Sequence, residues 1–218
     1  MATRSGRPGL AVGIDVAEEA KGLDLVALDD GRRIVATRGR LSVAEAAAEV
    51  ASLSPDVVCI DSPSGWARRG RSRQSERELA RLGFRCFATG PDPGDHPFYR
   101  WMRVGMRIFE ALAPLYPLYR GGPAAGRAAE VFPHATAVVL ACRPRSQGET
   151  KLRFRRLALQ SHGVDQSALV SADRVDAALA ALTGALALAG RCQALGDPEE
   201  GMVLLPDLVT DLDVAGRR

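Results

Sequence analysis

Two stretches, LAVGID at residues 10–15 and DVVCID at residues 56–61, decide the fold of this chain. Each is a short apolar run that ends on an aspartate, Asp15 or Asp61. Continuous apolar runs of this length predict strands that are buried on both faces of a sheet. A carboxylate in such a strand costs free energy unless it is paired or holds a metal. We therefore expect both aspartates at the carboxyl edge of one sheet, where α/β proteins form their sites.

The segment between these two strands predicts a hairpin and a helical crossover. LDLVALD (23–29) and RRIVATRG (32–39) are typical of strands, and Asp29, Asp30 and Gly31 form a hairpin signal between them. LSVAEAAAEVASL (41–53) predicts a helix, because Ser42 and Glu45 have the spacing of a capping box. The order strand, strand, strand, helix, strand indicates a mixed sheet in an α/β fold, with helices on both faces.

The remaining segments complete that pattern without a repeat or a linker. Residues 62–73 and 88–96 are rich in Gly, Pro, Ser or Arg and predict loops. Residues 75–83, 97–113, 150–162 and 173–190 predict helices, and residues 84–87 and 130–133 predict short strands. We expect a single domain over residues 1–218, with a core from about residue 10 to residue 206.

Composition excludes some classes of protein and leaves others open. Hydrophobic residues make up 46% and charged residues 25% of the chain, which is typical of a globular protein. The net charge of +3 is too small to identify a nucleic-acid partner. Only Lys21 and Lys151 are lysines among the 29 basic residues. The arginine bias suits phosphate binding, but a GC-rich genome would also produce it.

Cysteine spacing and hydropathy suggest where the protein works. Cys59, Cys86, Cys142 and Cys192 have neither zinc-ligand spacing nor a disulfide pattern. The N-terminus lacks the apolar stretch of a secretory signal, and the apolar run from 175 to 190 is too short to span a bilayer. We expect a reducing, cytoplasmic location and no membrane partner.

Acidic residues from several predicted elements point to a metal site. Asp15 and Asp61 end strands, Glu130 lies in AAEVFPHA, and Asp173 and Asp176 open the helix DRVDAALAALTGALALAG. Carboxylates that converge from different elements are what a site for hard divalent cations needs. Alternatively, Asp173 caps its helix, Asp176 complements the helix dipole, and Glu130 pairs with an arginine.

Six motifs in order resemble one family. VGIDVA, IDSPSG, RSRQSERELAR, Gly105-Met106, EVFPHA and DRVDAALAALTG resemble domain of unknown function family 429, whose members are described as predicted nucleases of ribonuclease H-like fold. The resemblance implies that Asp15, Asp61, Asp173 and Asp176 are metal ligands and catalytic residues. It implies a catalytic or supporting role for Glu130 or, alternatively, a place among the metal ligands. It points to Asp15 as the ligand shared by two ions.

The resemblance also suggests substrate-binding residues. Arg71, Arg73 and Arg77 match the Arg/Glu segment and follow the Asp61 loop, so they could hold phosphate. They could equally form a solvated helix face. His134 is either a substrate-binding or a structural histidine. The aromatic residues near this edge suit either base stacking or a core role; they are Trp66, Phe98, Tyr99 and Trp101.

The function expected from these residues is phosphodiester hydrolysis in DNA or RNA with two Mg²⁺ or Mn²⁺ ions. One alternative is a nucleic-acid-binding or scaffold domain of the same fold without activity. A less favoured alternative is a phosphotransferase of the actin and sugar-kinase type, which needs a phosphate-binding turn after the first strand. VAEEAKG (16–22) does not provide that turn. The sequence leaves open the nucleic acid, its strandedness, a nucleotide substrate and the oligomeric state.

Overall fold

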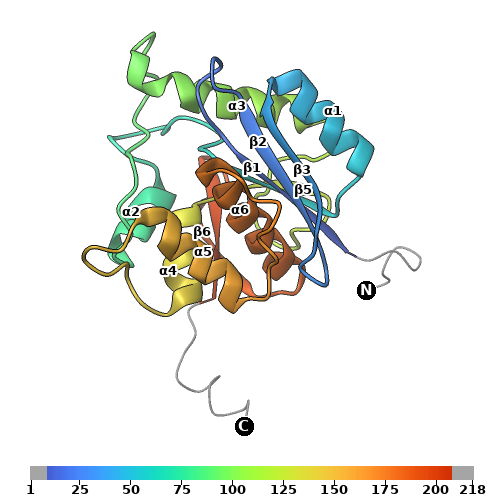
Figure 1. The fold of residues 1–218 in the computed structure, drawn as a ribbon. Coiled ribbons are helices and arrows are strands. Elements are labelled where there is room, and N and C mark those ends of the chain that lie inside the picture. The colour runs from blue at the N-terminus through green and yellow to red at the C-terminus, as the bar shows by residue number, and fades with distance from the viewer. Residues whose placement is uncertain (1–8, 208–218) are drawn as a thin grey trace.

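A computed structural model describes residues 9–207, which form one seven-stranded mixed sheet with helices on both faces (Figure 1). The strands are β1 (Leu10–Asp15), β2 (Leu23–Asp29), β3 (Ile34–Leu41), β4 (Val57–Asp61), β5 (Arg127–Val131), β6 (Cys192–Asp197) and β7 (Gly201–Pro206). Their order across the sheet is β3-β2-β1-β4-β5-β7-β6.

Strand directions divide the sheet into two parts. β1, β2 and β3 form an antiparallel meander. β1, β4, β5 and β7 are parallel neighbours, and β6 runs antiparallel to β7 at the edge. An antiparallel meander followed by parallel strands is the ribonuclease H-like arrangement. The fold class expected from the sequence is therefore confirmed.

Six α-helices cover the sheet in the described residues. They are α1 (Val43–Leu53), α2 (Gln74–Arg81), α3 (Arg100–Leu112), α4 (Pro133–Ala141), α5 (Lys151–Ser161) and α6 (Ala172–Leu188), and a 3-10 turn (Pro97–Tyr99) precedes α3. α1 and α3 lie together on one face, and α6 lies on the other with α4 and α5 packed beside it (Figure 1). α2 contacts β6 and β7.

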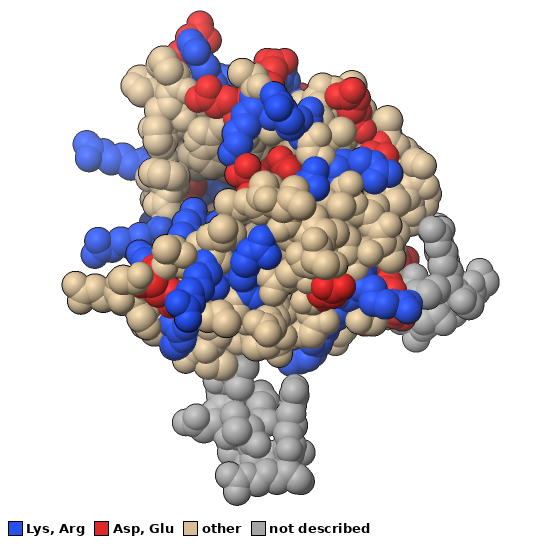
Figure 2. Space-filling model, in the orientation of Figure 1, with Lys and Arg blue, Asp and Glu red and all other residues tan. Residues whose placement is uncertain are grey.

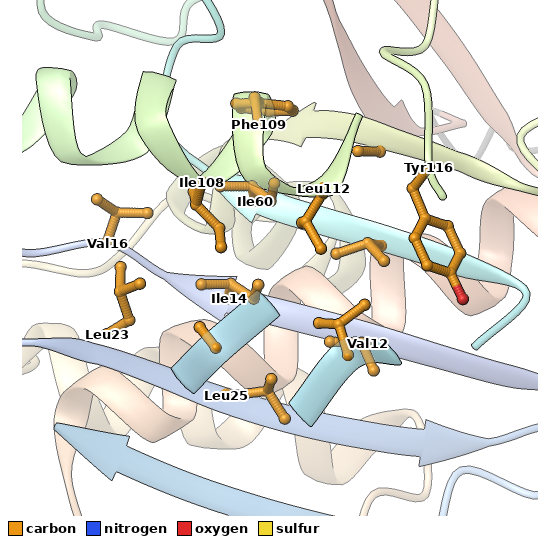
Figure 3. Close-up of a cluster of buried hydrophobic side chains, with 14 of the residues drawn as sticks. Val12, Ile14, Val16, Leu23, Leu25, Ile60, Ile108, Phe109, Leu112 and Tyr116 are labelled. Carbon is orange, nitrogen blue, oxygen red and sulfur yellow. The ribbon is translucent and has the colours of Figure 1, made fainter. Parts of the chain in front are cut away.

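The core on the α1/α3 face is built from alternate residues of neighbouring strands. Val12 and Ile14 of β1 and Ile60 of β4 pack with Ile108 and Leu112 of α3 (Figure 3). The residues between them, such as Ala11 and Cys59, face α6 instead. Since successive side chains of a strand alternate between faces, β1 and β4 are buried on both sides and appear in the sequence as continuous apolar runs.

Several elements differ from the sequence prediction. Residues 84–87 form no strand, because no neighbouring strand pairs with them. The strand expected at 130–133 lies at 127–131, and Pro133 instead occupies the first turn of α4, where its missing N–H costs nothing. α4, β6 and β7 were not expected. Cys59, Cys86, Cys142 and Cys192 are all free thiols.

No helix among residues 9–207 is long and apolar enough to cross a membrane.

Candidate active site

The register of the central strands brings Asp15 and Asp61 together. β1 and β4 are parallel, and Asp15 is the direct neighbour of Asp61 at their carboxyl ends. Both aspartates share the strand face of Ala11 and Cys59, which is the face covered by α6. Asp15 is 9% exposed. The two carboxylates therefore lie side by side under α6.

A glycine in β1 allows α6 to approach them. A Cβ on Gly13 would lie 2.0 Å from the Ala177 carbonyl oxygen and 2.3 Å from the Ala181 nitrogen. Only a residue without a side chain fits at this contact. The first turn of α6 therefore reaches the carboxyl end of β1 and brings Asp173 and Asp176 there.

Burial and neighbouring negative charge raise the pKa of three of these carboxylates, Asp15, Asp61 and Asp176. Burial, together with the charges of Asp61, Asp176 and Asp173, raises the pKa of Asp15 well above its usual range. Burial and the charge of Asp176 raise the pKa of Asp61 to about 7. Burial also raises the pKa of Asp176. Four carboxylates from β1, β4 and α6 thus form one acidic cluster, and they destabilise one another when all are ionised.

Three cations border the acidic cluster, and sequence reasoning did not select them. Lys21 donates to Asp173 over 2.7 Å, and Arg155 of α5 donates to the Asp176 Oδ2 atom. Lys151 lowers the pKa of both Asp61 and Asp176 through its charge. The only two lysines of the chain therefore both lie at the acidic cluster. Their rarity in an arginine-rich chain was the signal that could have identified them.

A fifth carboxylate, Asp24, was also missed. It is the β2 neighbour of Asp15, it is buried, and Arg174 lies 3.5 Å from its Oδ1 atom. Burial and the charge of Asp173 raise the pKa of Asp24.

The donor chemistry of the acidic cluster suits a hard divalent cation. Its ligand atoms are carboxylate oxygens, and the buried Asp176 Oδ1 atom has no hydrogen-bond partner. Between residues 9 and 207, however, no group of three or more acidic, histidine or cysteine side chains is close enough to surround one ion. Asp173 and Asp176 each direct an oxygen to a cation of the protein. All four aspartates could share an ion only if these side chains turned.

Glu130 lies apart from the acidic cluster, for a reason of register. Its neighbour on β4 is Ile60, not Asp61, so its side chain leaves the sheet on the α1/α3 face. Glu130 is 1% exposed, and it accepts hydrogen bonds from Arg73 at 2.7 and 2.8 Å and from the Ser64 hydroxyl at 2.5 Å. Among the roles that the sequence leaves open for Glu130, the structure shows the pairing with an arginine.

The three arginines expected to bind phosphate have separate environments. Arg73 is 3% exposed, and it donates a hydrogen bond to Glu76 at 3.1 Å as well as to Glu130. Its buried guanidinium therefore connects these two carboxylates. Arg71 and Arg77 are exposed, and Arg77 donates to the Ser72 carbonyl. Arg73 lines the cavity beside Asp61, but Glu76 and Glu130 already pair with its guanidinium, and phosphate binding by the three arginines stays a prediction. The ion pair with Glu130 instead anchors the loop that follows Asp61.

A cavity of about 480 Å³ opens beside Asp61. α5 and the loop before it contribute Arg145, Lys151 and Arg155, whereas Phe87 and Trp101 come from α3 and the loop that precedes it. His134 of α4 and Phe132 also line this cavity. Burial, with the charges of Arg155, Lys151 and Arg145, lowers the pKa of His134, so that its imidazole is neutral at pH 7.

The aromatic residues near this edge divide into two groups. Trp101 lines the cavity. Trp66, Phe98 and Tyr99 pack on one another, with Trp66 and Tyr99 edge to face at 5.8 Å and Phe98 and Tyr99 at 4.9 Å. These contacts therefore connect the loop after β4, which carries Trp66, with the 3-10 turn before α3.

Comparison with known families gives a match to this chain over residues 13–201. The matching family is described as "Protein of unknown function (DUF429)". The chain belongs to the DUF429 family. The resemblance drawn from its motifs is thereby confirmed, and the DUF429 region includes every member of the acidic cluster. No curated protein matches this chain.

Among solved structures, RuvC of Thermus thermophilus is similar to this DUF429 chain. The TM-score is 0.42 and the sequence identity is 14%, with 86% of this chain and 99% of RuvC covered.

Proposed function

We propose that this protein is a metal-dependent nuclease that hydrolyses phosphodiester bonds in nucleic acid. The observation that supports this function best is the acidic cluster of Asp15, Asp61, Asp173 and Asp176. These carboxylates are gathered from three elements at the carboxyl edge of the sheet, with raised pKa values for three of them. Such a concentration of negative charge destabilises the fold and is compensated when a divalent cation binds.

The expected cofactor is Mg²⁺ or Mn²⁺, in one or two ions. Asp15, Asp61 and Asp176 would hold it, since Asp15 and Asp61 are fixed by adjacent strands and the Asp176 Oδ1 atom has no other partner. When bound, the ion lowers the pKa of a coordinated water and offsets the charge of the phosphate. Asp173 would complete the ligand set after leaving Lys21.

The side chains of the protein would supply the other steps of hydrolysis. Attack of a water oxygen on phosphorus breaks the bond to the leaving oxygen. The water proton must pass to a base, and the leaving oxygen takes up a proton from solvent. A cluster carboxylate that holds no ion, or bulk water, can accept that proton. Lys151 and Arg155 lie on the cavity side of Asp61, where their charges would hold the phosphate oxygens of the substrate.

A second candidate function is nucleic-acid binding without turnover. Its support is the pairing of Lys21 with Asp173 and of Arg155 with Asp176, because these cations already offset part of the negative charge. In such a protein the two cations would replace the metal permanently. Metal-dependent cleavage is the property that distinguishes the two candidates.

The test is a cleavage screen with labelled single-stranded, duplex and branched DNA and RNA in Mn²⁺ or Mg²⁺. We expect cleavage of at least one substrate, its loss in EDTA, and its loss in Asp15→Asn and Asp61→Asn. Asp30→Asn is the matched control, because Asp30 is an exposed aspartate at the opposite end of β2. Cleavage that persists in Asp15→Asn would come from a contaminant or from another site, and it would contradict the proposal.

A further inference from the structure

The cavity beside Asp61 combines two kinds of chemistry. Its basic side chains come mainly from α5 and the loop before it, and its aromatic side chains come from Phe132 and the segment before and at the start of α3. Figure 2 shows Lys and Arg side chains gathered on the left of the molecule, over the part of Figure 1 that holds α4, α5 and the loop between them. A ligand of this cavity should therefore have an anionic part and a flat apolar part.

Several of the basic side chains are not neutralised by a carboxylate, so they can bind an anionic ligand. Arg85, Arg145 and Lys151 are exposed, and none of them forms an ion pair with a carboxylate in the part of the chain that the structure describes. The Nε atom of Arg155 is buried at the cavity without a hydrogen-bond partner. A phosphate group would satisfy these donors, because guanidinium and ammonium groups bind its oxygens with charge-assisted hydrogen bonds.

The aromatic side chains also keep exposed surface at the cavity, although the Phe87 ring contacts Phe98 edge to face, with 5.0 Å between the ring centroids. Phe87 is 63% exposed although it lies against the cavity, and Trp101 and Phe132 are half-buried there. Aromatic faces next to a basic surface bind nucleobases by stacking, and the contact accepts any base because every base has a π-face. The cavity volume of about 480 Å³ is suited to a small ligand.

We propose that this cavity binds one unpaired nucleotide, with its base against the aromatic side chains and its phosphate against the basic ones. A base stacked in a duplex cannot enter a recessed cavity, so the nucleotide must come from a single strand, from an extruded position or from a free mononucleotide. This inference rests on the proposed function in one respect only: the bound phosphate would lie next to Asp61.

The experiment measures nucleotide binding without metal. Trp66→Phe leaves Trp101 as the only tryptophan, and its fluorescence then reports on the cavity. We expect AMP and UMP to change this signal saturably in EDTA. Ribose 5-phosphate and inorganic phosphate should bind at least about tenfold more weakly, since they have no base to stack. Equal binding of all four ligands, or no saturable change, would overturn the inference.

Variants in the same background test the two sides of the cavity. Phe87→Ala and Lys151→Ala should each weaken AMP binding by about tenfold. Leu115→Ala and Arg127→Ala are the controls: both residues are exposed and neither lines the cavity. Their AMP affinity should equal that of the parent. An unchanged affinity in Phe87→Ala with a preserved melting temperature would contradict the assignment.

A comparison of oligonucleotide and AMP affinities identifies the source of the nucleotide. Together with the cleavage screen, it separates this inference from the nuclease proposal. A short single-stranded oligonucleotide that binds at least tenfold more tightly than AMP indicates a strand, and equal affinity indicates a free nucleotide. An equal signal from an end-closed duplex would overturn the inference. Nucleotide binding without Mn²⁺-dependent cleavage would reject only the nuclease proposal, and cleavage without nucleotide binding would reject only this inference.

Discussion

Asp15 and Asp61 have the environment of residues kept for function rather than for stability. Each is the last residue of a buried strand, and each has a raised pKa because burial and neighbouring carboxylates disfavour its charge. Arg73 pairs directly with Glu130, whereas Arg155 pairs with Asp176 and offsets only part of the effect that raises the pKa of Asp61. The contrast separates an acidic residue that stabilises the fold from a pair that costs stability.

This contrast predicts how stability depends on pH in the absence of metal. A carboxyl whose pKa is raised by folding stabilises the protein below its unfolded pKa, and the stabilisation is lost as pH rises through the folded pKa. For Asp61 that window runs from about 4 to about 7. In EDTA, the free energy of unfolding should therefore fall between pH 4.5 and pH 8 by roughly 1–4 kcal/mol.

Chemical denaturation at several pH values checks this prediction. Asp61→Asn should flatten the fall and be at least as stable as the wild type at pH 8, whereas Asp30→Asn should keep the wild-type slope. A stability that rises toward pH 8, or an Asp61→Asn variant that is less stable there, would make Asp61 a structural ion-pair partner.

Substitutions in the buried pair of Arg73 and Glu130 should lower stability, in contrast to Asp61→Asn. Removing one partner leaves an uncompensated buried charge, so Arg73→Met and Glu130→Gln should each lose about 3–5 kcal/mol of stability. Arg77→Ala, an exposed change on the same helix, should lose no more than about 1 kcal/mol. Urea unfolding measures all three. Small losses in Arg73→Met would mean that its contacts with Glu76 and Glu130 are not maintained in solution.

The elements of the sheet were predictable where the pattern was local. Strand LAVGID, the hairpin and the capped helix at Ser42 each carried their own signal, and each forms. α4, β6 and β7 carried weaker signals. PHATAVVLA is apolar all round, with no polar face to reveal its period, and β6 and β7 depend on pairing with each other and with β5.

The part of the candidate site that could be predicted from the sequence consists of acidic residues at the ends of apolar segments. Asp15, Asp61, Asp173 and Asp176 follow from apolar runs that end or begin on an acid, and they converge. The environment of Glu130 depends on the register of β5, because a change of one residue moves a side chain to the other face. Arg155 reaches the acidic cluster only through the tertiary fold, and as one of many arginines it carried no sequence signal.

The approach of α6 to β1 yields a prediction for Gly13. A methyl group at this position would overlap the Ala177 carbonyl, so Gly13→Ala should force α6 away and cost about 1–3 kcal/mol or more. Gly65→Ala is the matched control, because a Cβ there has no neighbour within 4 Å. Melting temperatures of the two variants decide the point. An unchanged melting temperature in Gly13→Ala would show that the α6 contact with β1 is looser than described.

Across the whole molecule, the arrangement of charge favours phosphate contacts by the exposed basic residues of the cavity over contacts by the segment from Arg71 to Arg77. Arg71 and Arg77 are exposed and do not line the cavity at Asp61. Arg73 lines it but is paired with Glu76 and Glu130, whereas Arg85, Arg145 and Lys151 line it without an ion pair among the described residues. Arg85 is far in sequence from Arg145 and Lys151, which is why no local motif linked the three.

Salt titration of nucleic-acid binding tests this assignment. Each lost phosphate contact lowers the log–log salt slope by about 0.7–0.9. Changing Arg85, Arg145 and Lys151 together to Ala should therefore lower the slope by up to about 2–3. Changing Arg71 and Arg77 together should alter it less, and Arg127→Ala should leave it unchanged. The reverse order would return the phosphate contacts to the segment before and within α2.

The central claim is that the acidic cluster binds a divalent cation, and calorimetric titration with Mn²⁺ tests it most directly. At pH 6, where Asp61 is largely protonated, binding should release protons, which appear as a dependence of the measured heat on the ionisation enthalpy of the buffer. Asp15→Asn should weaken binding strongly, whereas Asp30→Asn should not. An absence of Mn²⁺ binding, or an affinity unchanged in Asp15→Asn, would contradict the account.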